Sequence, residues 1–147
     1  MLQPINDKDN WISEIIKDDP IRKNLSLDFR INEHSQMFAY WNKDSLGSVC
    51  CVRYTQGIPE SIDDMQNKSS DDSDTVTFYT VWSYSKGSGR TIINQATDWI
   101  LEKNKNIKNV VTLSPKTEMA EKFHLSNGAF KYRENSDTIN YAYILDE

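Results

Sequence analysis

The alternation of apolar and polar residues predicts three strands in the first third of the chain. Leu25–Ile31 alternates large apolar residues with polar ones, which is typical of a half-buried strand. Gln36–Trp41 predicts a second strand. Leu46–Thr55 predicts a third, with apolar residues on both faces that favour a central position. A short helix over Asn10–Asp19, with isoleucines at helical spacing and Pro20 after it, precedes them.

The second half of the chain alternates strands and helices. Thr75–Trp82 is rich in β-branched and aromatic residues, and Thr91–Lys103 carries its apolar residues on one helical stripe. Val110–Leu113 predicts a short buried strand parallel to Thr75–Trp82, because a strand–helix–strand unit returns by a right-handed crossover. The remaining elements are a helix that starts at Ser114-Pro115 and ends at Asn127-Gly128, and a final hairpin of Phe130–Arg133 and Thr138–Leu145. We therefore expect an α/β (α+β) fold, a mixed sheet with helices on its faces.

Residues 57–74 interrupt this pattern with a proline, four serines and five aspartates. They predict a long acidic surface loop with one helical turn at Ser61–Asn67. A solvated excursion is preferred here over a functional loop.

Length, charge and cysteine content exclude several classes of protein. A chain of 147 residues is enough for one domain, predicted over 1–147. The net charge of −5, with no block of lysine or arginine, argues against a broad nucleic-acid interface. The sequence has no apolar run long enough to span a membrane, and its N-terminus lacks the apolar core of a signal peptide. We therefore expect a cytoplasmic protein. Cys50 and Cys51 are adjacent and point to opposite faces of a strand, which favours one in the core and one facing away over a disulfide, and no metal site is expected.

A glycine-rich turn between a predicted strand and a predicted helix carries the clearest candidate chemistry. Ser83–Arg90 reads Ser-Tyr-Ser-Lys-Gly-Ser-Gly-Arg. Backbone N–H groups at a helix N-terminus favour negative charge, and Gly87 and Gly89 let a ligand approach the backbone closely. The sequence therefore predicts a cradle for the phosphates of a small molecule.

The order of elements and two motifs resemble the GCN5-related N-acetyltransferase family. Its pyrophosphate loop has the form Gln/Arg-x-x-Gly-x-Gly/Ala, and here Tyr84 replaces the leading residue while Gly87 and Gly89 match. The last helix of that family reads Asn-x-x-Ala-x-x-x-Tyr-x-x-x-Gly-Phe. Here the matching positions hold Thr117, Ala120, His124, Gly128 and Ala129. The resemblance implies a mostly antiparallel central sheet with a splayed parallel strand pair at its centre.

The resemblance also implies a ligand and a reaction. The ligand would be coenzyme A in an acyl form, such as acetyl-CoA, and the reaction acyl transfer to the amine of a small molecule or peptide by direct attack. His124 stands where the family places a tyrosine acid, and an imidazole with an unperturbed pKa of about 6.5 suits proton transfer. Tyr79 or Thr77 would face the acceptor, and Asp74, Glu118 or a chain of waters would serve as base. The residues that the resemblance assigns to the cofactor are Val81, Trp82, Ser83, Ser85, Lys86, Gly87, Ser88, Gly89, Arg90 and Thr117.

Two other readings stay open at this point. The substituted motif residues fit a module of the same fold that binds without catalysing. The run Thr112-Leu113-Ser114-Pro115 resembles a segment of malonyl-CoA decarboxylases, which share the fold and use a serine or threonine with a histidine. Thr112, Ser114 and His124 could make such a set. The final strand, Thr138–Leu145, could pair with a second copy and form a homodimer.

Overall fold

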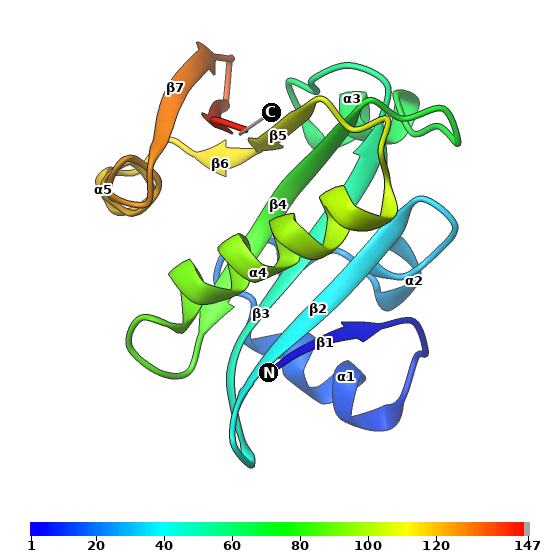
Figure 1. Ribbon diagram of the computed structural model, residues 1–147, viewed down its shortest axis with the longest axis vertical. Coiled ribbons are helices and arrows are strands. Elements are labelled where there is room, and N and C mark those ends of the chain that lie inside the picture. Colours follow the sequence, from blue (N-terminus) through cyan, green and yellow to red (C-terminus); the bar gives the residue numbers. More distant parts are fainter. Residues whose placement is uncertain (146–147) are drawn as a thin grey trace.

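The computed structural model describes residues 1–145, so the last two residues of the predicted domain lie outside the described part. Its centre is an eight-stranded sheet in the order β1-β2-β3-β4-β5-β8-β6, with β7 paired to β8 (Figure 1). Only β4 and β5 run parallel, and all other pairs are antiparallel. The strands are β1 (Leu2–Ile5), β2 (Ser35–Asn42), β3 (Ser45–Thr55), β4 (Thr75–Ser83), β5 (Asn109–Thr112), β6 (Ser114–Pro115), β7 (Ala129–Glu134) and β8 (Thr138–Tyr143).

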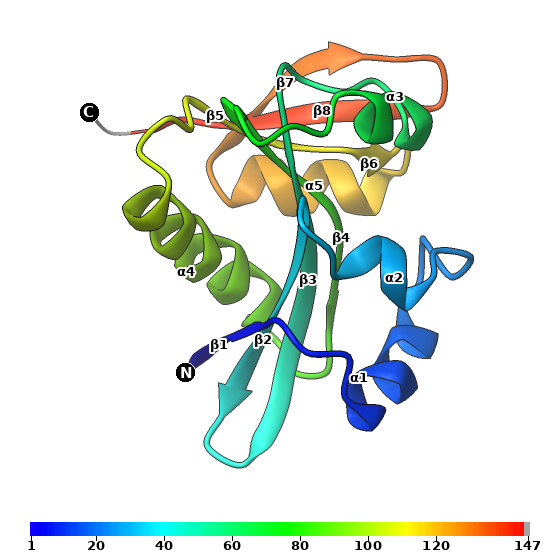
Figure 2. The same cartoon turned by 90° about the vertical axis from the view of Figure 1, so that its right-hand side faces the viewer.

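Helices cover both faces of the sheet and give it two cores. Figure 2 shows α4 on one side of the central strands and α1 and α2 on the other. Alternate residues of β3 and β4 face the two sides, so each strand contributes to both cores. The helices are α1 (Asn10–Ile15), continued by a 3₁₀ turn (Ile16–Asp18), then α2 (Leu27–Arg30), α3 (Ile62–Asn67), α4 (Ser88–Lys103) and α5 (Glu118–Ser126). Among the described residues, no helix is long and apolar enough to span a bilayer.

The parallel pair β4 and β5 separates part-way along its length, as the family resemblance implied. The ladder runs from Thr75 opposite Asn109 to Phe78 opposite Thr112, and Leu113 N donates to Phe78 O at 3.0 Å. Beyond this point β4 pairs only with β3, while the other chain leaves as β6 to pair with β8. A wedge therefore opens between β4 and the β6–α5 segment. The predicted fold class is confirmed.

The predicted strand over Leu25–Ile31 is wrong, because this segment holds the short helix α2. Ser26 caps the helix, and its hydroxyl accepts from Phe29 N at 3.2 Å. The alternation placed Arg30 towards solvent, whereas its side chain is fully buried and pairs with a carboxylate. The N-terminal strand β1 was not expected, because its four residues include a proline and too few apolar positions to show a pattern.

Ser114-Pro115 does not begin a helix, as the sequence led us to expect, but forms β6. Proline lacks an N–H, and β6 tolerates it because one side of this strand faces the wedge and has no partner strand. The helix α5 instead begins after Thr117, whose hydroxyl accepts from Ala120 N at 3.2 Å. Its predicted end is confirmed, with Gly128 at a φ of 97°.

The structure corrects two further expectations, one about the adjacent cysteines and one about the last strand. Cys50 and Cys51 face opposite cores as free thiols, and both are fully buried, so neither faces away from the core. The strand β8 lies between β7 on one side and β5 and β6 on the other, so it is not the free edge that a homodimer was expected to use. Within the described residues, that edge belongs to β7.

The segment 57–74 contains the predicted helical turn as α3, but it is not simply a solvated excursion. Its Met65 is fully buried. The β8 side chains of Asn140 and Thr138 donate to the carbonyl oxygens of Pro59 and Glu60 at 2.9 and 2.7 Å. The backbone of this segment is therefore bonded to the last hairpin, with the acidic side chains Asp63, Asp71 and Asp72 exposed.

Candidate functional site

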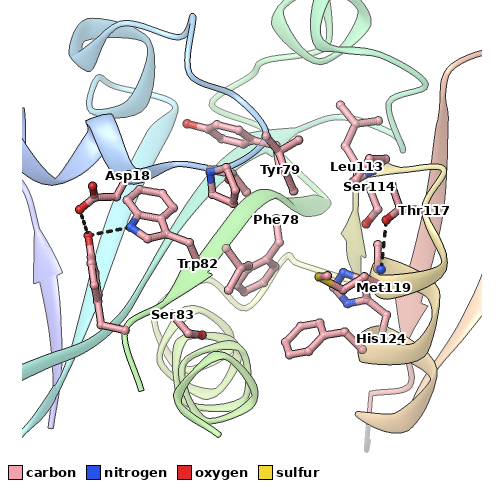
Figure 3. A pocket seen from close by; sticks show the side chains of 18 residues that line it. Asp18, Phe78, Tyr79, Trp82, Ser83, Leu113, Ser114, Thr117, Met119 and His124 are labelled. Atoms are coloured by element: carbon pink, nitrogen blue, oxygen red, sulfur yellow. Dashed lines mark hydrogen bonds between the residues drawn. The ribbon is translucent and has the colours of Figure 1, made fainter. Parts of the chain in front are cut away.

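A cavity of about 820 Å³ fills the wedge between β4 and α5 (Figure 3). One wall is β4 from Phe78 to Ser83, and the opposite wall is Leu113–Pro115 with α5. The segment that follows α1 closes a third side through Asp18, Pro20 and Ile21. A cavity of this size lies in the range of small-molecule sites. Its lining includes six of the predicted site residues, namely Tyr79, Val81, Trp82, Ser83, Thr117 and His124.

The wedge depends on an irregularity in β4 and on Arg22. Cys51 pairs with Thr80 and Val52 with Phe78, so Tyr79 is an extra, unpaired residue that bends the strand. Arg22 then bridges the separated strands, since its Nε lies 3.3 Å from Tyr79 O and its Nη2 lies 2.9 Å from the Leu113 O. One guanidinium thus takes the place of the first missing rung of the ladder.

A buried ion pair fixes the segment that carries Arg22. Asp19 Oδ2 lies 2.8 Å from Arg30 Nη1, and both side chains are fully buried. Asp19 Oδ1 also accepts from Ile21 N, Arg22 N and the Thr80 hydroxyl at 2.8 to 2.9 Å. Burial acts to raise the pKa of Asp19, but these backbone and side-chain hydrogen bonds outweigh it and hold the pKa below its usual value. The segment is therefore tied to β4 as a charged network.

The predicted phosphate loop begins α4 and follows Ser83 and Tyr84 of the cavity wall, but residues 85–90 do not themselves line the cavity. Gly87 caps the helix with a φ of 85°, which favours glycine. Four backbone N–H groups have no acceptor within residues 1–145, those of Lys86, Gly87, Gly89 and Arg90. The Ser85 N–H is not free, because it donates to Gly47 O at 3.3 Å. The loop therefore offers a cluster of unpaired donors at a helix N-terminus.

Side chains of the loop hold its shape and leave positive charge outside. The hydroxyls of Ser85 and Ser88 bond to each other and accept from the Asn42 amide at 2.9 and 3.3 Å. A Cβ at Gly89 would lie 2.8 Å from Ser83 Oγ, so only glycine fits there without displacement. Among the predicted cations, Arg90 donates to Ser126 on α5, while the exposed Lys86 forms no ion pair within residues 1–145.

His124 lines the cavity from α5 as a neutral ring. Asn127 Nδ2 donates to the Tyr143 hydroxyl at 3.3 Å, and the same hydroxyl lies 2.8 Å from His124 Nδ1, where the tautomer of the ring decides which group donates. When the hydroxyl donates, the ring proton lies on Nε2. The imidazole also stacks on Tyr141, with centroids 5.1 Å apart. Burial lowers the pKa of His124 to about 4, so the sequence-based expectation of an imidazole that titrates near neutral pH is corrected. This ring can donate a hydrogen bond at pH 7, but it carries no spare proton.

The other candidate catalytic groups lie less favourably. Tyr79 is 2% exposed, its ring packs edge-on against Phe29 at 5.7 Å, and its hydroxyl has no partner within residues 1–145. Burial raises the pKa of Tyr79 well above its usual value, so it is a neutral phenol. Thr77, Asp74 and Glu118 do not line the cavity.

The carboxylate that does line the cavity is Asp18, which the sequence had placed only within the predicted helix Asn10–Asp19. Trp82 Nε1 donates to Tyr84 Oη at 3.0 Å, and Tyr84 Oη donates to Asp18 Oδ2 at 2.6 Å. Asp18 lies 66 residues from Tyr84 in the sequence and meets it only in the folded chain, so no sequence spacing could have revealed the set. Figure 3 shows Asp18 and Trp82 together at one end of the cavity, across from His124.

Away from the cavity, one group of side chains has the composition of a metal site. Ligand atoms of Glu33, His34 and Asp71 lie within 4.8 Å of one another. His34 Nε2 already bonds to Asp71 Oδ1 at 2.9 Å, and the two carboxylates are exposed. Exposed groups of this kind are common without an ion, so the cavity is the candidate functional site.

Comparison with solved structures identifies the fold. No protein-family model and no curated protein sequence matches the chain. Malonyl-CoA decarboxylase from Agrobacterium vitis is 25% identical, with a TM-score of 0.67 over 84% of this chain and 35% of that one. Tetrahymena GCN5 is 13% identical, with a TM-score of 0.62 over 99% of this chain and 96% of that one. A Bacillus subtilis acetyltransferase in complex with CoA is 12% identical, with a TM-score of 0.60 over 98% and 97%.

The two kinds of match differ in extent. The chain spans between 32% and 60% of the length of the three malonyl-CoA decarboxylase structures that it matches. It covers nearly the whole of the two acetyltransferase structures. The chain therefore has the fold that these acetyltransferase structures share.

Proposed function

We propose that this protein binds an acyl-CoA thioester, such as acetyl-CoA, and transfers its acyl group to an amine. The observation that carries the proposal is the cluster of four unpaired N–H groups in the Lys86–Arg90 loop, which closely follows Ser83 and Tyr84 of the cavity wall along the chain. A diphosphate accepts hydrogen bonds from such a cluster, and the helix dipole adds to the attraction. The solved acetyltransferase from Bacillus subtilis that shares the fold contains CoA.

The residues present fit each part of this substrate. The exposed Lys86 and Arg90 side chains supply positive charge next to the loop. The edge of β4 that β5 leaves unpaired, along Val81–Ser83, offers backbone groups to the amides of a pantetheine arm. Thr117 and His124 line the opposite wall. The thioester supplies an activated acyl carbon with a thiol leaving group.

In the proposed reaction, the amine nitrogen forms a bond to the acyl carbon as the carbon–sulfur bond breaks. The acceptor enters as an ammonium ion and loses two protons in all. One goes to the departing sulfur by way of solvent, so the net products are an amide, a thiol and one released proton. We assign the backbone N–H of Val81 or Trp82 to the acyl oxygen. We also assign the His124 proton to Nε2, from which the ring would donate a hydrogen bond to the sulfur as negative charge develops there. The ring is neutral, so it donates this bond without releasing a proton.

Coenzyme A is expected to raise the melting temperature, because a ligand that binds only the folded state stabilises it. The Lys86→Glu variant should weaken CoA binding by about tenfold or more, since it replaces a cation beside the phosphates with an anion. Lys105→Glu, at an exposed site in the turn after α4, is the matched control and should leave the shift unchanged. A thermal-shift titration with CoA measures binding by the unaltered protein and by both variants. An unaltered melting temperature of the unaltered protein at millimolar CoA would contradict the proposal.

Decarboxylation of malonyl-CoA is the second candidate, favoured by the 25% identity to the Agrobacterium vitis enzyme. Ser114 and His124 both line the cavity. However, Ser114 Oγ donates to Thr112 Oγ1 at 2.7 Å, so its proton points away from a partnership with histidine. None of the cavity-lining residues is a lysine or an arginine that could bind the malonyl carboxylate.

We therefore expect thiol release from acetyl-CoA that requires an amine, and little carbon dioxide from malonyl-CoA. The assay measures both products with the same preparation, and Ser114→Ala should reduce amine-dependent release by less than about tenfold because the hydroxyl is turned towards Thr112. Carbon dioxide release without an amine, lost in Ser114→Ala, would establish the decarboxylase instead. Tight CoA binding with no turnover of any amine would favour the non-catalytic reading.

A further inference from the structure

The charge of the cavity lining is uneven. Of the 18 residues that line it, Asp18 is the only one with a carboxylate, and none is a lysine or an arginine. His124 adds no charge, because its low pKa keeps the ring neutral. A ligand that enters from the side of Asp18 therefore meets one negative group and no positive one.

Asp18 is held with one oxygen occupied and the other available. An indole N–H can only donate, so Trp82 obliges the Tyr84 hydroxyl to point its own proton at Asp18 Oδ2. Asp18 Oδ1 has no partner within residues 1–145. The carboxylate is exposed at the cavity mouth, while the Asp19–Arg30 pair fixes the backbone next to it. Such an oriented acceptor is suited to an ammonium group.

The rest of the mouth is apolar. Met119 on α5 is 82% exposed and Ile21 is 43% exposed, although both line the cavity. Pro20 and Pro115 line the same region. Large apolar side chains exposed around a cavity mark a surface that buries apolar parts of a ligand. This rim favours a hydrocarbon or aromatic body over a polar one.

We propose that the acyl acceptor is an apolar primary amine without an anionic group, and that Asp18 receives its ammonium group as it enters. The inference rests on the proposed acyl transfer and names the substrate class of that site. An acceptor with a carboxylate or phosphate has no cation to pair with in the cavity. The Trp82–Tyr84 hydrogen bonds make both aromatic residues positioning groups for Asp18.

Three amines separate the two parts of the proposal. 2-Phenylethylamine has the expected charge and body, L-phenylalanine adds only a carboxylate, and ethylamine lacks the aromatic ring. With acetyl-CoA, kcat/KM for 2-phenylethylamine should exceed that for each of the others by about tenfold or more. Equal rates for 2-phenylethylamine and L-phenylalanine would overturn the charge argument, and equal rates for ethylamine would overturn the apolar argument.

The variant Asp18→Asn should raise the KM for 2-phenylethylamine by about tenfold, with kcat and the CoA thermal shift little changed. Asp98→Asn removes the same charge from an exposed position on α4 that does not line the cavity, and should change neither constant. An unchanged KM in Asp18→Asn would overturn the proposal.

Calorimetric binding of 2-phenylethylamine to the protein without CoA separates this proposal from the acyl transfer on which it rests. Binding that Asp18→Asn weakens, in a protein that gives no CoA shift, would remove the proposed function and keep the amine subsite. A CoA shift together with amine binding that Asp18→Asn leaves unaltered would keep the function and remove the subsite.

Discussion

Replacing Arg30 by methionine is expected to lower the free energy of unfolding by about 3 to 5 kcal/mol, because it leaves the buried Asp19 carboxylate without its counter-ion. The Arg30 side chain also donates to Leu25 O at 3.1 Å and to Arg22 O at 2.7 Å. Methionine of similar length fills space but makes none of these bonds. The segment that carries Arg22 would then lose its bond to α2.

Urea unfolding followed by tryptophan fluorescence measures this change. Lys17→Met is the matched control, since Lys17 pairs with Glu14 at the surface, where both side chains are more than two-thirds exposed. That pair should contribute less than about 1 kcal/mol. A loss for Arg30→Met as small as for Lys17→Met would show that Asp19 is not held as a buried anion. The double variant Asp19→Asn with Arg30→Met should recover part of the loss, because no unpaired charge remains.

The parts of the fold that follow from local pattern could be predicted from the sequence. Each of the strands β2, β3 and β4 and the helix α4 buries one or both of its faces. The buried face of an element appears as a regular spacing of apolar residues in its own sequence. The glycine loop could be placed for the same reason. Its N–H groups are unpaired because a helix begins there, and the sequence shows where that happens.

The same local reasoning failed where side chains from distant segments decide the structure. Arg30 is buried because it forms an ion pair with the buried Asp19 carboxylate. A polar residue that the alternation pattern placed towards solvent therefore lies in the core. Thr80 and Asp19 meet across 61 residues of chain, and Tyr84 and Asp18 across 66. No spacing rule connects such positions, which is why the carboxylate of the cavity was missed.

The chemical state of the predicted histidine also depended on tertiary structure. His124 was found from its place in a motif, but its pKa follows from burial between Tyr141 and Phe123. The sequence therefore located the residue and misjudged its charge. This error changes the mechanism, since a neutral ring donates a hydrogen bond where a cation would donate a proton.

The folded protein is expected to lose about 2 kcal/mol of stability between about pH 6.5 and pH 5 because of His124. In the unfolded chain this imidazole takes up a proton near its ordinary pKa of about 6.5. In the folded protein burial lowers the pKa to about 4, so the proton is not taken up until much lower pH. Acid therefore favours the unfolded state throughout this interval, and the loss ends only below the folded pKa.

Urea unfolding at steps across this interval measures the slope, and His124→Gln should remove it, because glutamine cannot be protonated there. His34→Gln is the control, since that histidine lies near the surface beside Asp71 and its replacement should leave the slope in place. The interval from about pH 6.5 to pH 5 lies above the pH at which buried carboxylates such as Asp19 take up protons, so these groups do not contribute to the slope. A slope that survives in His124→Gln would mean that His124 is charged in the folded state, and it would return the imidazole to the role of a proton donor.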